Sequence, residues 1–284
     1  MLSLRSTLSA LLAVLVLLAA AATPALAQRD WYSNNRGYER NFGSDSDSST
    51  SGRGRNVAGE FDYYALVLSW SPTHCSSPEG SDDELQCQRR DGRRYAFILH
   101  GLWPQYERGY PSDCRTARRP FVPQPLIDSM LDIMPSPRLV IHEYRKHGTC
   151  SGLDPAGYFT LSRRLFQSIR IPERYTNPYE TQFVSPRELQ RDLAAANPDL
   201  DPESIAVSCA GGTKSRLREV RICFSKDGEP RACGSNEDQR RLCSASEIAI
   251  PPVRSTKTGP DSAKDRENYS RIPLPGPRVI QGPH

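Results

Sequence analysis

Three apolar segments in the middle of the chain have the pattern of β-strands. Tyr63 to Trp70 is almost wholly aromatic and aliphatic, and a second such segment, Tyr95 to Leu99, stops at His100 before a glycine and a proline. In Glu219 to Phe224, apolar residues alternate with charged ones. The pattern predicts three strands, the second of which ends at His100. The end of a strand is a favourable place for a catalytic or binding side chain.

Apolar residues spaced three or four positions apart predict helices elsewhere. One helix start has a capping box, because Ser185 precedes Pro186 at the first helical position and Glu188 stands three residues after the serine. Strands and helices do not alternate strictly along the chain, which favours an α+β fold. The predicted helices are Pro125 to Met134, Leu139 to His147, Thr160 to Ile169 and Pro186 to Ala196.

The two ends of the chain differ from its middle in composition. Residues 1–27 contain a basic residue, a long apolar run and a small-residue site ending at Ala27, as in a secretory signal peptide. We expect residues 28–59 to be a disordered leader and residues 251–284 a disordered proline-rich tail. Residues 60–250 remain as one catalytic domain of ordinary size, in a protein that is secreted or periplasmic and has no membrane span.

The cysteine count fits an exported protein. An even number of cysteines behind a signal peptide predicts four disulfides, although counting leaves the pairing open. No Cys-x-x-Cys pair occurs, which argues against a zinc site built from cysteines. The cysteines are Cys75, Cys87, Cys114, Cys150, Cys209, Cys223, Cys233 and Cys243.

The formal net charge of +4 is small for a protein that binds nucleic acid. Arginines nevertheless gather before and after the second predicted strand, where they would either steer a polyanion or form an ordinary solvated surface. These two interpretations have equal weight. The arginines are Arg89, Arg90, Arg93, Arg94, Arg115, Arg118 and Arg119.

Two short motifs hold three of the five histidines. The first, Phe97 to Pro104, contains His100 and Trp103. The second, Ile141 to Cys150, is predicted to be helical up to Gly148, so that its polar residues project from one short rigid element. These polar residues are His142, Glu143, Lys146 and His147.

A metal site in the second motif is disfavoured by its spacing. The metalloprotease pattern needs histidines four residues apart, on one helical face. His142 and His147 are five apart, which places them about 140° from one another around a helix. The side chain of Lys146 would add a positive charge where a divalent ion would have to bind.

The same residues suit RNA cleavage without a metal. A base must take the proton of the ribose 2′-hydroxyl, an acid must protonate the leaving 5′-oxygen, and positive charge must stabilise the transition state. His100 and His147 can form the proton-transfer pair. Lys146 and a protonated His142 can hold the phosphoryl oxygens, and Glu143 can hydrogen-bond the phosphoryl group if protonated or orient a neighbouring donor if not.

The two motifs resemble the active-site segments of the ribonuclease T2 family, and Phe61 to Pro72 resembles the family's opening strand. The resemblance covers about residues 60 to 245. It implies a mainly antiparallel sheet flanked by helices and stapled by disulfides. It also implies a secreted endoribonuclease that needs no cofactor and cuts single-stranded RNA through a 2′,3′-cyclic phosphate, usually at acidic pH.

Carried over position by position, the resemblance makes His147 the general base and His100 the general acid. Tyr144 replaces a tryptophan that is common in the family, a change of packing rather than of chemistry. Trp103 is expected to stack on a base, although a core aromatic at a strand end is the alternative. The full catalytic set implied by the resemblance is His100, His142, Glu143, Lys146 and His147.

The resemblance also bears on the disulfides. It implies that Cys114 pairs with Cys150 and so tethers the second motif. We further expect Cys223 with Cys233 inside the pair Cys209 with Cys243, which leaves Cys75 with Cys87.

The sequence thus predicts a metal-independent endoribonuclease whose partner is single-stranded RNA and for which a monomer suffices. Two alternatives stay open. A metal-dependent hydrolase that uses the His-Glu segment would lose activity to a chelator, whereas an inactive relative would bind RNA or another partner without cutting it.

Overall fold

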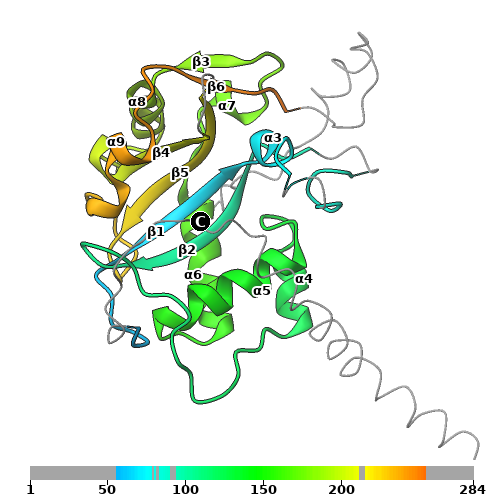
Figure 1. Ribbon diagram of the computed structural model, residues 1–284, viewed down its shortest axis with the longest axis vertical. Helices are drawn as coiled ribbons and strands as arrows, with labels where there is room; N and C mark the ends of the chain where they lie inside the picture. The colour runs from blue at the N-terminus through cyan, green and yellow to red at the C-terminus, as the bar shows by residue number, and fades with distance from the viewer. Residues whose placement is uncertain (1–55, 79, 81–82, 90–93, 211–214, 254–284) are drawn as a thin grey trace, which may run out of the picture. The chain divides into compact units, whose positions relative to one another are not determined.

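A computed structural model describes residues 56–78, 80, 83–89, 94–210 and 215–253 of the chain (Figure 1). The predicted signal peptide and most of the predicted leader and tail lie outside these residues, as do Arg90 and Arg93.

A sheet of six strands forms the centre of the described part (Figure 1). Its strands follow the order β2-β1-β5-β6-β3, and β4 pairs with β5 beside this path. The pairings are antiparallel except that of β5 with β6, so the predicted α+β fold with a mainly antiparallel sheet is confirmed. The strands are β1 (Tyr63–Trp70), β2 (Phe97–Gln105), β3 (Gln182–Val184), β4 (Ile205–Ala210), β5 (Arg216–Phe224) and β6 (Ile248–Ile250).

Strand β2 is longer than the sequence predicts. It continues past His100 to Gln105, because Pro104 is tolerated in a strand at the edge of the sheet and Gly101 lies beside a β-bulge. Val67 of β1 pairs with Gly101 whereas the next residue, Leu68, pairs with Leu99. His100 is therefore the extra residue of a bulge in the middle of a strand, not the last residue of a strand.

Two groups of helices pack against two different strands of the sheet (Figure 1). Helices α5 and α6 pack against β2, with α4 against α5, and α8 and α9 pack against β4. The helices are α3 (Ser71–His74), α4 (Gln124–Met130), α5 (Pro137–Lys146), α6 (Pro155–Ser168), α7 (Glu173–Thr176), α8 (Pro186–Ala196) and α9 (Gln239–Leu242).

Side-chain caps explain where the longer helices begin. In α8 the Ser185 hydroxyl accepts the N–H of Glu188 at 3.1 Å, and the helix has the predicted bounds. The Asp154 side chain caps α6, which therefore starts at Pro155, five residues before the predicted Thr160. Helix α4 ends at Met130, earlier than predicted, and tight turns follow it.

Four disulfides connect the cysteines of the described part, in the pairs expected above. Cys114–Cys150 ties the segment after α5 to the long loop that follows β2. The other pairs are Cys75–Cys87, Cys209–Cys243 and Cys223–Cys233.

The described residues at the two ends are packed on the domain. Gly59 donates its backbone N–H to the Cys150 carbonyl at 2.9 Å. At the other end Val253 is buried, and Trp70 donates its indole N–H to the Pro251 carbonyl at 3.1 Å. Across the described ranges, no helix has both the length and the apolar character needed to cross a membrane.

Candidate active site

One face of the sheet carries the candidate site. Residues directly opposite one another in paired strands share a face, so Gly101 of β2, Val67 of β1 and Arg221 of β5 form one row. His100 lies on this same face, with its Nδ1 2.9 Å from Oε1 of Glu219, and the bulge brings Gly101 to the same side as His100. Without the bulge, strict alternation would point His100 and Gly101 to opposite faces.

Helix α5 brings the second motif to this face. Ser136 caps its start, and His147 is the residue at its C-terminal end. The Asp113 N–H bonds the Lys146 carbonyl at 2.8 Å, which fixes the last turn against the loop held by the disulfide at Cys150. The basic side chains of the last turn are favourably placed against the negative end of the helix dipole.

Glu143 lies at the centre of the site and is fully buried. Its Oε2 accepts the indole N–H of Trp103 at 2.7 Å, and its Oε1 lies 3.6 Å from Nε2 of His100. Oε1 has no hydrogen-bond partner among the described residues. Burial raises the pKa of Glu143, so the carboxyl can be protonated at mildly acidic pH and can donate from this oxygen.

Gly101 provides the space for the Glu143 carboxyl. A Cβ atom at this position would lie 1.9 Å from Oε2 of Glu143 and 2.7 Å from Nε1 of Trp103. No side chain fits without displacing that hydrogen bond. The sequence suggested only a strand breaker here, because the close approach comes from a helix distant in the sequence.

Trp103 links the two histidines of the predicted proton-transfer pair. Its ring stacks on the His147 ring at a centroid distance of 4.8 Å and meets the His100 ring edge-on at 5.2 Å. The Arg221 guanidinium also lies over the indole, 4.9 Å from the ring centroid. Only 9% of Trp103 is exposed, which leaves too little ring surface for a base to stack. The geometry favours a positioning role over the predicted base-stacking role.

The environment of His100 favours its protonated form. Burial alone would lower its pKa, but the hydrogen bond to Glu219 and the negative charges of Glu143 and Glu219 raise it above the ordinary value. Glu219 stays ionised, because the hydrogen bond from His100 and the charge of Arg221 outweigh burial and lower the pKa of the Glu219 carboxyl.

His147 has the opposite tuning. Burial, together with the positive charges of Lys146 and of other nearby cations, holds the pKa of His147 well below the ordinary value of histidine. Its ring is therefore neutral and able to accept a proton. His100, which favours the protonated form, and His147, which favours the neutral form, both contact Trp103. They form a pair whose pKa values are shifted apart.

His142 differs from the expectation of a protonated ring. Burial and the neighbouring charge of Lys146 lower its pKa to about 4. The ring is therefore neutral in the free protein at mildly acidic pH. It still has one N–H that can donate to a phosphoryl oxygen.

Three residues of this face were not predicted to belong to the site: Glu219, Arg221 and Gly101, which leaves space for the Glu143 carboxyl. The available signal was the alternation in β5, which placed charged residues between buried apolar ones. In a sheet buried on both faces, such charges need partners, but the sequence does not show which groups face them.

Other predicted residues lie elsewhere or have structural roles. His74 lies 3.7 Å from Asp83, near the Cys75 disulfide. Tyr144 is buried, and its ring contacts Tyr158 and Phe159. Arg115, Arg118 and Arg119 are exposed on the loop after β2. Among the residues that the structure describes, no three His, Cys, Asp or Glu side chains are grouped as potential metal ligands.

Comparison with known proteins gives a consistent picture. The chain matches the ribonuclease T2 family over residues 61–233. It is 39% identical over 186 residues to a ribonuclease of Aeromonas hydrophila, covering 61% of this chain and 76% of that protein. It is 30% identical over 192 residues to a probable ribonuclease of Haemophilus influenzae, covering 64% of each.

Solved structures support the fold. An RNase-related protein from Calystegia sepium superposes with a TM-score of 0.53 at 23% identity, covering 69% of this chain and 99% of that one. Trichomaglin, described as an S-like ribonuclease, superposes with a TM-score of 0.51 at 21% identity, covering 69% of this chain and all of that one. At these identities the two structures show the shared fold alone.

Proposed function

The chain belongs to the ribonuclease T2 family of endoribonucleases, and on this premise we propose that it cleaves single-stranded RNA without a metal ion, leaving 2′,3′-cyclic phosphate ends. The observation that carries the proposal is that His100 and His147 both contact Trp103 beside the buried Glu143 carboxyl, in surroundings that shift their pKa values in opposite directions. Such a pair supplies an acid and a base at the same pH.

Each proton transfer has an assigned group. His147 takes the proton of the ribose 2′-hydroxyl, whose oxygen then attacks phosphorus. As the bond from phosphorus to the 5′-oxygen breaks, His100 gives its Nε2 proton to that oxygen. The two histidines end with exchanged protonation states, and a later hydrolysis of the cyclic phosphate in the reverse sense would restore them.

The remaining residues stabilise the charge that develops on the phosphoryl group. Lys146 supplies a fixed positive charge, and neutral His142 donates one N–H. The protonated form of Glu143, which burial favours, can donate from Oε1 to a non-bridging oxygen. Trp103 holds this carboxyl in place through its indole N–H.

We also propose that the enzyme acts outside the cytoplasm. The signal-peptide pattern of residues 1–27 and the four disulfides of the domain support this localisation. The proposed domain limits, residues 60–250 between a leader and a tail, follow the same pattern, with contacts extending to Gly59 and Val253.

The test is cleavage of a single-stranded oligoribonucleotide with excess chelator at about pH 5 and about pH 7, with product ends identified by mass spectrometry. We expect cyclic-phosphate ends in the presence of chelator. Cleavage only after metal is added would support a metal-dependent hydrolase, and binding without cleavage by a folded protein would support an inactive relative.

Single substitutions assign the roles. His100→Ala and His147→Ala should each abolish cleavage while the protein stays folded. His74→Ala is the matched control, because it removes a partly exposed histidine near another disulfide. Near-normal cleavage by either of the first two variants would overturn the assignment.

A further inference from the structure

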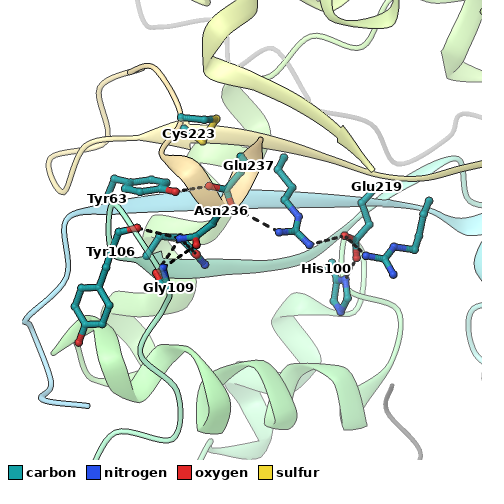
Figure 2. A network of polar contacts seen from close by, with 12 residues as sticks. Tyr63, His100, Tyr106, Gly109, Glu219, Cys223, Asn236 and Glu237 are labelled. Atoms are coloured by element: carbon teal, nitrogen blue, oxygen red, sulfur yellow. Dashed lines mark hydrogen bonds and ion pairs between the residues drawn. A yellow bond between two sulfur atoms is a disulfide. The ribbon is translucent and has the colours of Figure 1, made fainter. Parts of the chain in front are cut away.

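A buried chain of charged groups extends from the proposed general acid along the sheet (Figure 2). Beyond His100 lies Glu219, whose Oε2 is 3.4 Å from Nη2 of Arg221. The other end of that guanidinium, Nη1, is 3.6 Å from Oε1 of Glu237, and Glu237 in turn accepts a hydrogen bond from the Tyr63 hydroxyl. None of the groups beyond His100 has a role in the mechanism proposed above.

Small residues on the neighbouring strands make room for these long side chains. Glu219 lies opposite Ser69 of β1 and Ser208 of β4. Arg221 lies in the next row of the same face, opposite Val67 and Ala206. Only 6% of the Glu219 side chain and 12% of the Arg221 side chain are exposed. Water therefore solvates neither charge to any extent, so the ion pairs must offset the cost of burying them.

The contact between Glu219 and His100 distinguishes the two ring nitrogens. Nδ1 lies 2.9 Å from the Glu219 carboxylate, whereas Nε2 faces Glu143 in the centre of the site. An ionised carboxylate only accepts hydrogen bonds, so Nδ1 must carry a proton whenever this contact is made. The proton that His100 can release is then the one on Nε2.

We infer that Glu219 is a positioning residue for the general acid: it retains the Nδ1 proton of His100, aims Nε2 at the leaving 5′-oxygen, and is itself held ionised by Arg221. The inference rests on the proposed function, since it concerns how His100 delivers its proton. When Nε2 protonates the leaving oxygen, the ring becomes the neutral Nδ1–H tautomer, still bonded to Glu219. No proton passes to the carboxylate.

Arg221 prevents the alternative in which Glu219 takes the Nδ1 proton. Its positive charge beside the carboxylate, fixed on its other side by Glu237, favours the ionised form of Glu219. The charged and titratable groups that act on His100 come from two elements packed around it. They are Glu219 and Arg218 of β5, and Glu143, His142 and His147 of α5 and its C-terminal end.

The test compares Glu219→Gln with the wild-type protein on two substrates. One is a dinucleotide, whose 5′-alkoxide leaves only if it is protonated. The other is the corresponding nucleoside 3′-(4-nitrophenyl phosphate), whose nitrophenolate leaves without an acid. Glutamine keeps the size of the side chain, but its amide can donate to Nδ1 and stabilise the wrong tautomer.

We expect Glu219→Gln to lower kcat on the dinucleotide about 100-fold, the scale of general acid catalysis, with KM little changed. The activated ester should be cleaved within about 3-fold of the wild-type rate, because it needs no acid. The alkaline limb of the pH profile on the dinucleotide should move to lower pH. Glu219→Asp keeps the charge and should recover part of the loss.

Two controls separate this role from a loss of folding and from failure of the proposed function. Glu229→Gln makes the same chemical change at an exposed position and should leave both rates unchanged. His100→Ala should reproduce the substrate dependence of Glu219→Gln. If His100→Ala instead cleaves the dinucleotide normally, the proposed function fails, and the inference falls with it.

The inference alone is overturned if His100→Ala shows the expected substrate dependence but Glu219→Gln lowers both rates equally or lowers neither. An equal loss would mean that Glu219 only supports the fold. Cleavage of the activated ester also reports folding, so a variant that retains it is a folded protein. As an independent readout, ¹⁵N NMR of the His100 ring should show protonated Nδ1 in the wild type and loss of this preference in Glu219→Gln.

Discussion

Substitution of Gly101 by alanine tests whether the close approach of α5 to β2 sets the chemistry. The new methyl group would lie 1.9 Å from Oε2 of Glu143. Glu143 is fully buried and accepts the Trp103 N–H at 2.7 Å through that same oxygen. The methyl group and this hydrogen bond therefore cannot both be accommodated.

The size of the effect follows from these distances. Oε2 must retreat by about 1.5 Å to reach ordinary van der Waals contact with the methyl group, which breaks the hydrogen bond with Trp103. A buried polar group left unsatisfied costs about 1 to 3 kcal/mol of stability. A misplacement of about 1 Å in an active site can cost about 100-fold in rate. We expect Gly101→Ala to lower kcat by that factor while the protein remains folded.

The assay is the initial rate of oligonucleotide cleavage at mildly acidic pH, with thermal unfolding measured on the same samples. Trp103→Phe removes the donor without crowding the site and should also lower the rate. Gly157→Ala is the matched control in helix α6, where the nearest atom to the new methyl group is a side-chain oxygen of Asp154 at 3.2 Å. It should leave cleavage unchanged.

A wild-type rate for a folded Gly101→Ala protein would refute this reasoning. It would mean that Glu143 can work from another position, and that the hydrogen bond from Trp103 does not hold the carboxyl for catalysis. A loss of rate that the Gly157→Ala control shares would point instead to a general effect of the substitution.

Three further substitutions or conditions extend these tests. Replacing Arg221 by methionine leaves the buried carboxyl groups of Glu219 and Glu237 without their cation, and it should cost about 3 to 5 kcal/mol of stability in urea unfolding. The control, Arg240→Met at an exposed position, should not lower the stability. Equal stabilities of the two variants would show that the buried ion pairs contribute little. Removing the disulfide Cys114–Cys150 as a double alanine variant should cost about 2 to 4 kcal/mol in the same assay and should also slow cleavage, because the bond anchors the end of α5. In a pH profile of initial rates, the base has a lowered pKa and must be neutral, so cleavage should persist well below pH 6.5. The acid has a raised pKa and must be protonated, so its limb should lie above pH 6.5; an optimum confined to alkaline pH would contradict both shifts.

Local signals in the sequence predicted β1 and α8 with their observed bounds, whereas β2, β5 and α6 are longer than predicted. The apolar run Tyr63 to Trp70 forms β1 with those bounds, and the capping signal at Ser185 places α8 at its predicted range. Both depend on interactions between residues a few positions apart. The short strands β3, β4 and β6 were not predicted, because their residues become strands only by pairing with distant partners.

The same distinction between local signals and long-range contacts applies to the candidate site. The two motifs predicted the endoribonuclease family from the sequence alone, and their residue types and spacing favoured proton transfer by histidines over a metal site. The arrangement of these residues follows only from the tertiary structure. The bulge that places His100 and Gly101 on one face, the space at Gly101 and the burial of Trp103 all depend on contacts between residues from 31 to 119 positions apart. Burial and neighbouring charges set proton affinities, and both are properties of the folded surroundings of a side chain rather than of its neighbours in the sequence.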